Sequence, residues 1–176
     1  MKKLTRFKAL IEAKSKVPTL DCEVTAFRAH LGFSPDTMRR DGFDPSTIEL
    51  HEQFFNRLES YAEQPLIGEY LTTLTPTDSY EASGVWVCTL KQIKNAAFGG
   101  GSPDEDLFPH GYVPIAGDGC GNSISFHFPS GLVVFAHHER VQEAIAGDHC
   151  ILADDIASFL DGFLNDRFAA RLEELG

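Results

Sequence analysis

No stretch of this 176-residue chain approaches the roughly 20 consecutive apolar residues that a membrane-spanning helix requires. The N-terminus is basic, but it lacks the apolar run of a secretory signal peptide. The four cysteines, Cys22, Cys88, Cys120 and Cys150, lie far apart without a C-x-x-C pair, which is typical of reduced thiols rather than of a disulfide framework. These absences predict a cytoplasmic protein that does not enter a membrane.

Motifs of common catalytic sites are also missing. The glycine run at residues 99–101 lacks the Gly-Lys-Ser/Thr ending of a phosphate-binding loop, so it predicts a flexible loop instead. No nucleophile stands in a recognisable elbow, and no pair of catalytic carboxylates is identifiable. The sequence therefore predicts a protein with no catalytic residue, no bound metal and no cofactor.

Positive charge is scarce over most of the chain. The sequence carries 15 Lys and Arg against 26 Asp and Glu, and six of the 15 lie in residues 1–16, so the remainder is strongly acidic. An acidic body repels the phosphates of nucleic acids and suits a basic protein partner, although negative charge also keeps small domains soluble. Asp104, Glu105 and Asp106, beside the glycine run, are predicted contacts for such a partner.

The length and composition predict a single domain over residues 1–176, with 43% hydrophobic and 23% charged residues, as in ordinary globular proteins. Residues 1–80 are predicted to be largely helical. Apolar side chains recur at helical spacing in residues 3–13, and a second helix is predicted from Ser46 or Thr47 to about residue 62.

Beyond residue 80 the apolar period changes from helical spacing to alternation. This change predicts a strand at residues 85–89, a short helix at 90–97 and then a loop as far as 109. Near the end of the chain, Asp154 or Asp155 is predicted to cap a final helix with a broad apolar stripe.

A β-hairpin with a three-residue Pro-Ser-Gly turn is predicted in the second half of the chain. Pairing Phe128 with Leu132 gathers the apolar side chains on one face and leaves a second face that includes His127, Phe135 and His137. Because the second face mixes imidazoles, small polar groups and an aromatic ring, it suits a binding surface better than a core. These three residues are therefore predicted protein contacts.

The seven histidines raise a zinc site as an alternative reading of the hairpin. In the predicted register, His127 lies four positions along the ladder from His137, roughly 13 Å at about 3.3 Å per residue. Zinc ligands bind at about 2 Å, so these two imidazoles cannot share an ion. The adjacent His138 points to the opposite face of the strand from His137, so the hairpin predicts no metal site.

The glycine-rich block Tyr-Val-Pro-Ile-Ala-Gly-Asp-Gly-Cys-Gly-Asn at residues 112–122 resembles the glycine-rich segment of the SUKH superfamily. The strand after it, the Gly-Leu-Val-Val-Phe strand with His-His-Glu behind it, and the Ala-Ser-Phe-Leu-Asp-Gly-Phe-Leu helix at residues 157–164 are similar to the family's following elements. The likeness covers residues 85–165 and leaves residues 1–80 unmatched.

This resemblance implies an α+β domain with a mostly antiparallel twisted sheet, helices packed on one face and a closing C-terminal helix. It also implies a non-catalytic module that docks onto another protein, because the superfamily includes cell-wall-assembly regulators and toxin-immunity proteins. The expected function is that of an immunity protein that neutralises a basic toxin or nuclease domain. Asp118 and Asn122 of the glycine-rich block join His127 as predicted contacts.

Two other functions stay open at this point. A regulatory or scaffold protein of the cell-envelope type would bind an endogenous partner. A small metal-dependent hydrolase could use His110, Asp118, Cys120 and His137, if the glycine-rich loop folds them together. The sequence does not set the oligomeric state.

Overall fold

The computed structural model describes residues 34–58, 70, 80–82, 84–98, 102–165, 167, 168, 172 and 174. Predictions for residues 1–33 and for the rest of the helical region after Leu58 fall outside these residues. Within the described part of the chain, no helix combines the length and the apolar character needed to cross a membrane.

Two helices precede the sheet, and each begins after a residue whose side chain accepts backbone hydrogen bonds from the first turn. Helix α3 (Pro35–Arg40) begins after Ser34, whose Oγ accepts the backbone N–H of Thr37. Helix α4 (Pro45–Leu58) follows Asp44, whose carboxylate accepts the N–H groups of Ser46 and Thr47 at 2.9 and 3.0 Å. The hydroxyls of Ser46 and Thr47 donate to the same carboxylate, and these bonds, followed by the backbone ones, lower the pKa of Asp44 well below its ordinary value.

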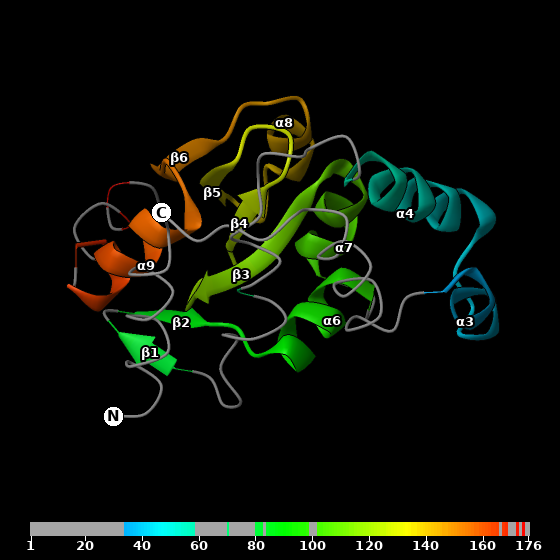
Figure 1. The fold of residues 1–176 in the computed structure, drawn as a ribbon, viewed down its shortest axis with the longest axis horizontal. Coiled ribbons are helices and arrows are strands. Elements are labelled where there is room, and N and C mark those ends of the chain that lie inside the picture. Colours follow the sequence, from blue (N-terminus) through cyan, green and yellow to red (C-terminus); the bar gives the residue numbers. More distant parts are fainter. Residues whose placement is uncertain are drawn as a thin grey trace.

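The sheet has six antiparallel strands, and their order in space is their order in the chain (Figure 1). This arrangement, together with the helices, confirms the predicted α+β class with an antiparallel sheet. The strands are β1 (Tyr80–Ala82), β2 (Val85–Val87), β3 (Tyr112–Asp118), β4 (Ser123–His127), β5 (Leu132–Ala136) and β6 (Cys150–Ala153).

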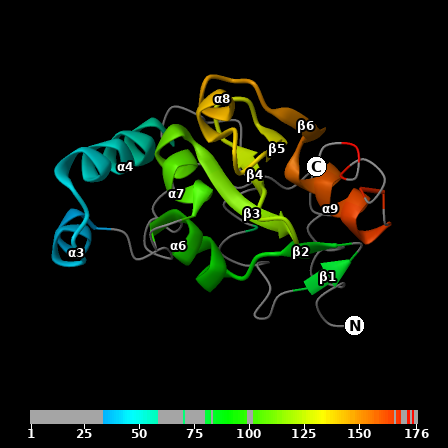
Figure 2. The same cartoon turned by 180° about the vertical axis from the view of Figure 1, so that it is seen from behind.

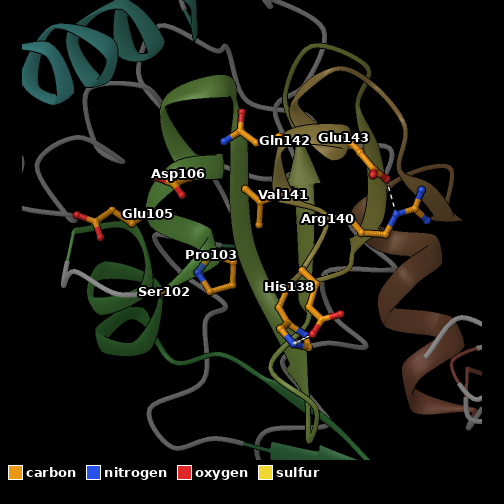
Figure 3. Close-up of a pocket in the computed structure, with 10 residues that line it drawn as sticks. Ser102, Pro103, Glu105, Asp106, His138, Arg140, Val141, Gln142 and Glu143 are labelled. Atoms are coloured by element: carbon orange, nitrogen blue, oxygen red, sulfur yellow. Dashed lines mark ion pairs between the residues drawn. The ribbon is translucent and has the colours of Figure 1, made fainter.

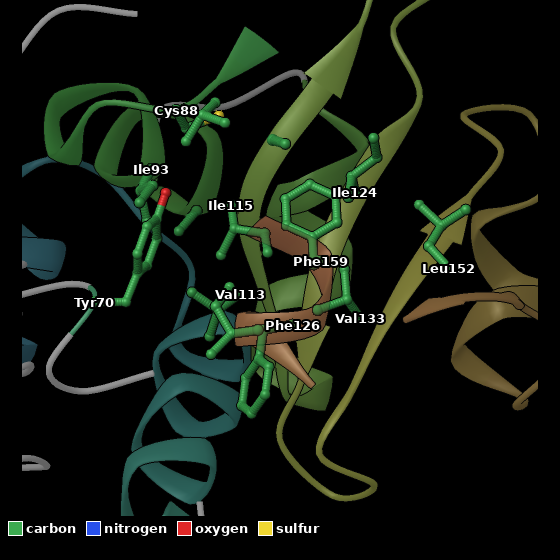
Figure 4. Close-up of a cluster of buried hydrophobic side chains, with 14 of the residues drawn as sticks. Tyr70, Cys88, Ile93, Val113, Ile115, Ile124, Phe126, Val133, Leu152 and Phe159 are labelled. Carbon is green, nitrogen blue, oxygen red and sulfur yellow. The ribbon is translucent and has the colours of Figure 1, made fainter. Parts of the chain in front are cut away.

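The main core lies between one face of the sheet and helices α4, α6 (Leu90–Phe98) and α9 (Ile156–Leu164). Along this face, α4 and α6 lie beside one edge of the long strand β3, and α9 lies beside its other edge (Figures 1 and 2). Figure 4 shows Phe159 of α9 among the strand residues Val113, Ile124 and Val133. The predicted final helix is confirmed, and Asp155 is its cap.

A second apolar cluster lies on the opposite face of the sheet. It contains Tyr112 of β3 and Val134 of β5, whose chain neighbours Val113 and Val133 belong to the main core. Because neighbouring strand residues point to opposite faces, the two clusters lie on opposite sides of the sheet. The short helices α7 (Pro103–Leu107) and α8 (Val141–Ile145) contribute to this cluster, so helices cover both faces rather than the one face expected.

The predicted register of the β4–β5 hairpin is wrong by one residue. His127 pairs with Leu132, so four residues form the turn, and Gly131 lies in the left-handed region with φ 76°. Phe128 leaves the ladder because its ring packs against Phe54 and Phe126 in the main core. A shift of one residue turns the side chains of one strand to the other face. Phe135 therefore faces the main core, where it is 3% exposed, and not a binding surface.

The loop predicted at residues 98–109 contains helix α7 and a 3-10 turn, η3 (Phe108–His110). Ser102 accepts the N–H of Asp104 at 3.3 Å, and Pro103 occupies the first helical position. Both are recognised helix-start signals, and the acidic residues that follow suit the positive end of a helix. Helix α7 forms one wall of the groove described next.

Candidate functional site

An open groove of about 640 Å³ separates α7 from the segment that joins β5 to α8 (Figure 3). Glu105 and Asp106 line it from α7. His138, Glu139 and Glu143 line it from the opposite wall, with Arg140 between them. The groove therefore brings together residues that lie more than 30 positions apart in the chain.

The lining of the groove is strongly acidic. Four carboxylates stand on it against one cation, Arg140, among the described residues. The guanidinium of Arg140 is already engaged, because it forms ion pairs with Glu143 and with Asp148, the latter at 3.5 Å. Since charges of one sign in a concave site reinforce one another, the groove attracts cationic groups.

His138 is held in the groove by a chain of hydrogen bonds from the glycine-rich block. The backbone N–H of His138 donates to Asn122 Oδ1 at 3.0 Å, and its ring Nδ1 lies 2.9 Å from the same oxygen. The amide nitrogen of Asn122 donates in turn to Asp118 Oδ2 at 2.8 Å. Asn122 is only 4% exposed, so the burial and both hydrogen bonds hold the imidazole in one place.

The turn between β3 and β4 explains why the glycine-rich block contains Asp118, Gly121 and Asn122. Asp118 Oδ1 accepts the backbone N–H groups of Cys120 and Asn122, each at 3.0 Å. Gly121 has a φ of 86°, a conformation that side chains with a Cβ rarely adopt. The block is therefore a structural turn that presents Asn122 to the chain after β5 (Figure 3 shows His138 on the groove side).

Two of the predicted contacts, Glu105 and Asp106, line the groove. Their neighbour Asp104 does not line it, and its Oδ1 is buried without a hydrogen-bond partner in the described part of the chain. Burial raises the pKa of Asp104, while hydrogen bonds from Ser123 and Ser102 partly oppose that rise. Asp104 therefore contributes to the packing beneath α7 instead of offering a carboxylate to a partner.

His137 stacks on His138 with 4.7 Å between ring centroids and 20° between ring planes. Its Nδ1 accepts the backbone N–H of Glu139 at 3.2 Å. The sequence predicted His137 as a contact and not His138, because the one-residue error in register exchanged the faces of alternate residues along β5. The sequence signal that could have indicated His138 was the pair of adjacent histidines after β5, opposite Asn122 at the end of the β3–β4 turn.

His127 lies in a different cluster on the second face of the sheet. Its ring stacks on Tyr112 with 4.3 Å between centroids and lies 5.2 Å from the ring of His149. Burial and the neighbouring His149 lower the pKa of His127 to about 4. Tyr112 donates its hydroxyl to the Ala144 carbonyl at 2.5 Å, and burial raises its pKa to about 12.

The four residues considered for a metal-dependent hydrolase are not brought together as a ligand set. Among the described residues, no three His, Cys, Asp or Glu side chains form a group that could hold a metal ion. Asp118 is engaged in the β3–β4 turn, whereas Cys120 is exposed. This arrangement gives the hydrolase alternative no supporting geometry in the described part of the chain.

No known protein family, no curated protein and no solved structure matches this chain. The resemblance of residues 85–165 to the SUKH superfamily therefore stays a prediction. The contacts of the groove are the basis for the functional proposal that follows.

Proposed function

We propose that the chain is a non-catalytic protein-binding domain that acts as an immunity protein. In this proposal a basic segment of a toxin or nuclease domain docks into the groove between α7 and the β5–α8 connection, and the complex blocks the toxin. The resemblance of the glycine-rich block to the SUKH superfamily is consistent with this role. A regulatory protein of the cell-envelope type would use the same surface on an endogenous partner.

The observation that carries the proposal is the imbalance of charge in the groove. Glu105 and Asp106 line one wall and Glu139 and Glu143 line the other, while Arg140 is already paired with acidic side chains. A basic segment complements the sign of these charges, and complementary charge speeds association and selects against acidic partners. The formal net charge of −11 adds long-range attraction for a basic domain.

The test measures binding to the polypeptide encoded by the neighbouring gene, by calorimetric titration of the full chain. A triple variant, Glu105→Gln, Asp106→Asn and Glu139→Gln, removes three charges from the groove. We expect it to bind about tenfold more weakly, because each lost charge pair at an interface costs up to about 1 kcal/mol. Added salt should weaken the wild-type complex more than that of the variant.

A matched control removes three exposed charges outside the groove, through Asp36→Asn, Asp41→Asn and Glu81→Gln. This control should retain binding within about twofold, because it changes net charge equally without altering the groove. Equal losses in both variants would show that net charge, and not the groove, attracts the partner. Binding without protection against the partner's toxicity would favour the cell-envelope alternative, and no binding would count against the immunity role.

A further inference from the structure

The amide of Asn122 can adopt only one orientation. The carboxylate of Asp118 accepts hydrogen bonds but cannot donate them when ionised, so the amide nitrogen must face Oδ2, 2.8 Å away. The backbone N–H of His138 can only donate, so the amide oxygen must face it at 3.0 Å. Both requirements direct the amide oxygen toward His138.

This orientation determines the tautomer of His138. Its Nδ1 lies 2.9 Å from the amide oxygen of Asn122, which can only accept, so Nδ1 carries the ring proton. In the neutral ring, Nε2 then has a lone pair and is an acceptor. Within the described part of the chain Nε2 has no hydrogen-bond partner, and Glu139 Oε1, 3.9 Å away, is beyond hydrogen-bond distance.

The position of His138 makes this acceptor usable. Its side chain lines the groove and is 41% exposed, so its free nitrogen is accessible to a ligand (Figure 3). Glu139 Oε1, which lies 3.9 Å from Nε2, also accepts. A ligand that presents N–H donors fits these two acceptors, and a positive charge on that ligand is favoured by the carboxylates around them.

We propose that Nε2 of His138 is the specific acceptor of the groove, and that it binds the ammonium of a lysine or the guanidinium of an arginine from the partner. Asn122 and Asp118 are positioning residues, because they hold the imidazole in the accepting tautomer. This inference rests on the proposed function, since it names the chemical group that the acidic groove receives. The hydrogen bond to Nε2 is directional, whereas the attraction between the acidic groove and a basic segment is not.

His137 provides an internal reference for this inference. Its Nδ1 accepts a backbone N–H, so its neutral ring carries the proton on Nε2, the opposite arrangement to His138. The two rings are adjacent in the chain and stacked on each other. A variant of His137 therefore removes an imidazole from the same place without removing the proposed acceptor.

The first experiment measures the tautomers by nitrogen and carbon NMR of the full chain at alkaline pH. We expect the Nδ1–H form for His138 and the Nε2–H form for His137. Asn122→Ala should move His138 toward the Nε2–H form, whereas a loss of packing alone would not select a tautomer. An Nε2–H form of His138 in the unaltered protein would overturn this inference and leave the proposed function standing.

The second experiment uses three blocked peptides of equal length, rich in lysine, in arginine or in glutamine, titrated into the full chain. We expect His138→Ala to weaken binding of the better basic peptide by about tenfold, the typical effect of one hydrogen bond to a charged group. His137→Ala should change it by less than about twofold, and the glutamine peptide should not bind. The stronger of the two basic peptides identifies the cation that the groove prefers.

The outcomes separate this inference from the proposal on which it rests. If the groove triple variant weakens binding of the basic peptides but His138→Ala does not, the acceptor role is wrong and the acidic groove remains. If the basic peptides fail to bind, or bind regardless of the groove carboxylates, the proposed function fails as well. Melting temperatures near that of the unaltered protein confirm that the groove triple variant and His138→Ala are folded.

Discussion

Two histidine clusters on this sheet place the same side chain in opposite environments. His138 is partly exposed in the groove, and a buried amide holds one of its ring nitrogens. His127 instead packs against the rings of Tyr112 and His149, where burial lowers its pKa to about 4. Each ring has a hydrogen-bonded Nδ1, His138 to Asn122 and His127 to Ser130, so the comparison teaches that burial, and not the polar anchor, decides which imidazole stays accessible.

Truncation of the stacked cluster should have the largest effect on stability. Tyr112→Ala removes a ring that is 1% exposed, together with its hydrogen bond to the Ala144 carbonyl. We expect the free energy of unfolding to fall by about 3–5 kcal/mol in urea denaturation. Tyr112→Phe keeps the ring and should cost only about 1–2 kcal/mol. Similar losses in both variants would mean that the hydroxyl, and not the ring, holds this cluster together.

Loss of the amide that anchors His138 should have the next largest effect. Asn122→Ala leaves Asp118 Oδ2 and the N–H of His138 without their partner, so we expect a loss of about 2 kcal/mol in the same measurement. Asn122→Asp is a useful second variant, because it keeps an acceptor for His138 but puts a second carboxylate beside Asp118. A loss below about 0.5 kcal/mol for Asn122→Ala would show that the turn holds itself without the amide.

Acid should destabilise the stacked cluster specifically. The unfolded chain binds a proton at His127 near the ordinary pKa of 6.5, but the folded protein does so only near 4. The stability from neutral His127 is therefore present above pH 6.5 and is lost progressively as the pH falls toward 4. From pH 7 to 5 we expect a loss of about 1 kcal/mol, after allowing for partial exposure. His127→Gln should flatten this part of the pH profile, and an unchanged profile would contradict the assignment.

Removal of the groove imidazole should have the smallest effect on the fold. His138→Ala leaves the buried Asn122–Asp118 pair in place and exposes no core, so we expect a loss of at most about 0.5 kcal/mol. The His138→Ala variant should still lose the stability assigned to His127 between pH 7 and pH 5. A large loss of stability would assign His138 to the fold and remove the contrast between the two clusters.

Local signals in the sequence predict several elements correctly. Asp155 caps α9, the apolar stripe continues through that helix, and a change of period separates β2 from α6. The same kind of signal at Ser102-Pro103 marks the start of α7, although the glycine run before it favoured a loop. Such features are predictable because caps and periodic apolar faces depend on residues within one or two turns of each other.

The candidate site was only partly predictable. Glu105 and Asp106 were expected as contacts from their charge alone, and they do line the groove. Phe135 was assigned to the wrong face, because the turn length depends on the packing of Phe128 against Phe54, far away in the chain. His138 was missed for a related reason, since its partner Asn122 lies 16 positions away across the hairpin.

The sequence by itself determined the helical caps, the alternating strands and the excess of negative charge, because each depends on composition or on near neighbours. Only the tertiary structure decided the hairpin register, the burial of Asp104 and the opposed walls of the groove. It also decided which of two adjacent histidines has a free accepting nitrogen. These properties depend on contacts between distant segments, and one residue of register is enough to exchange the buried and exposed faces of a strand.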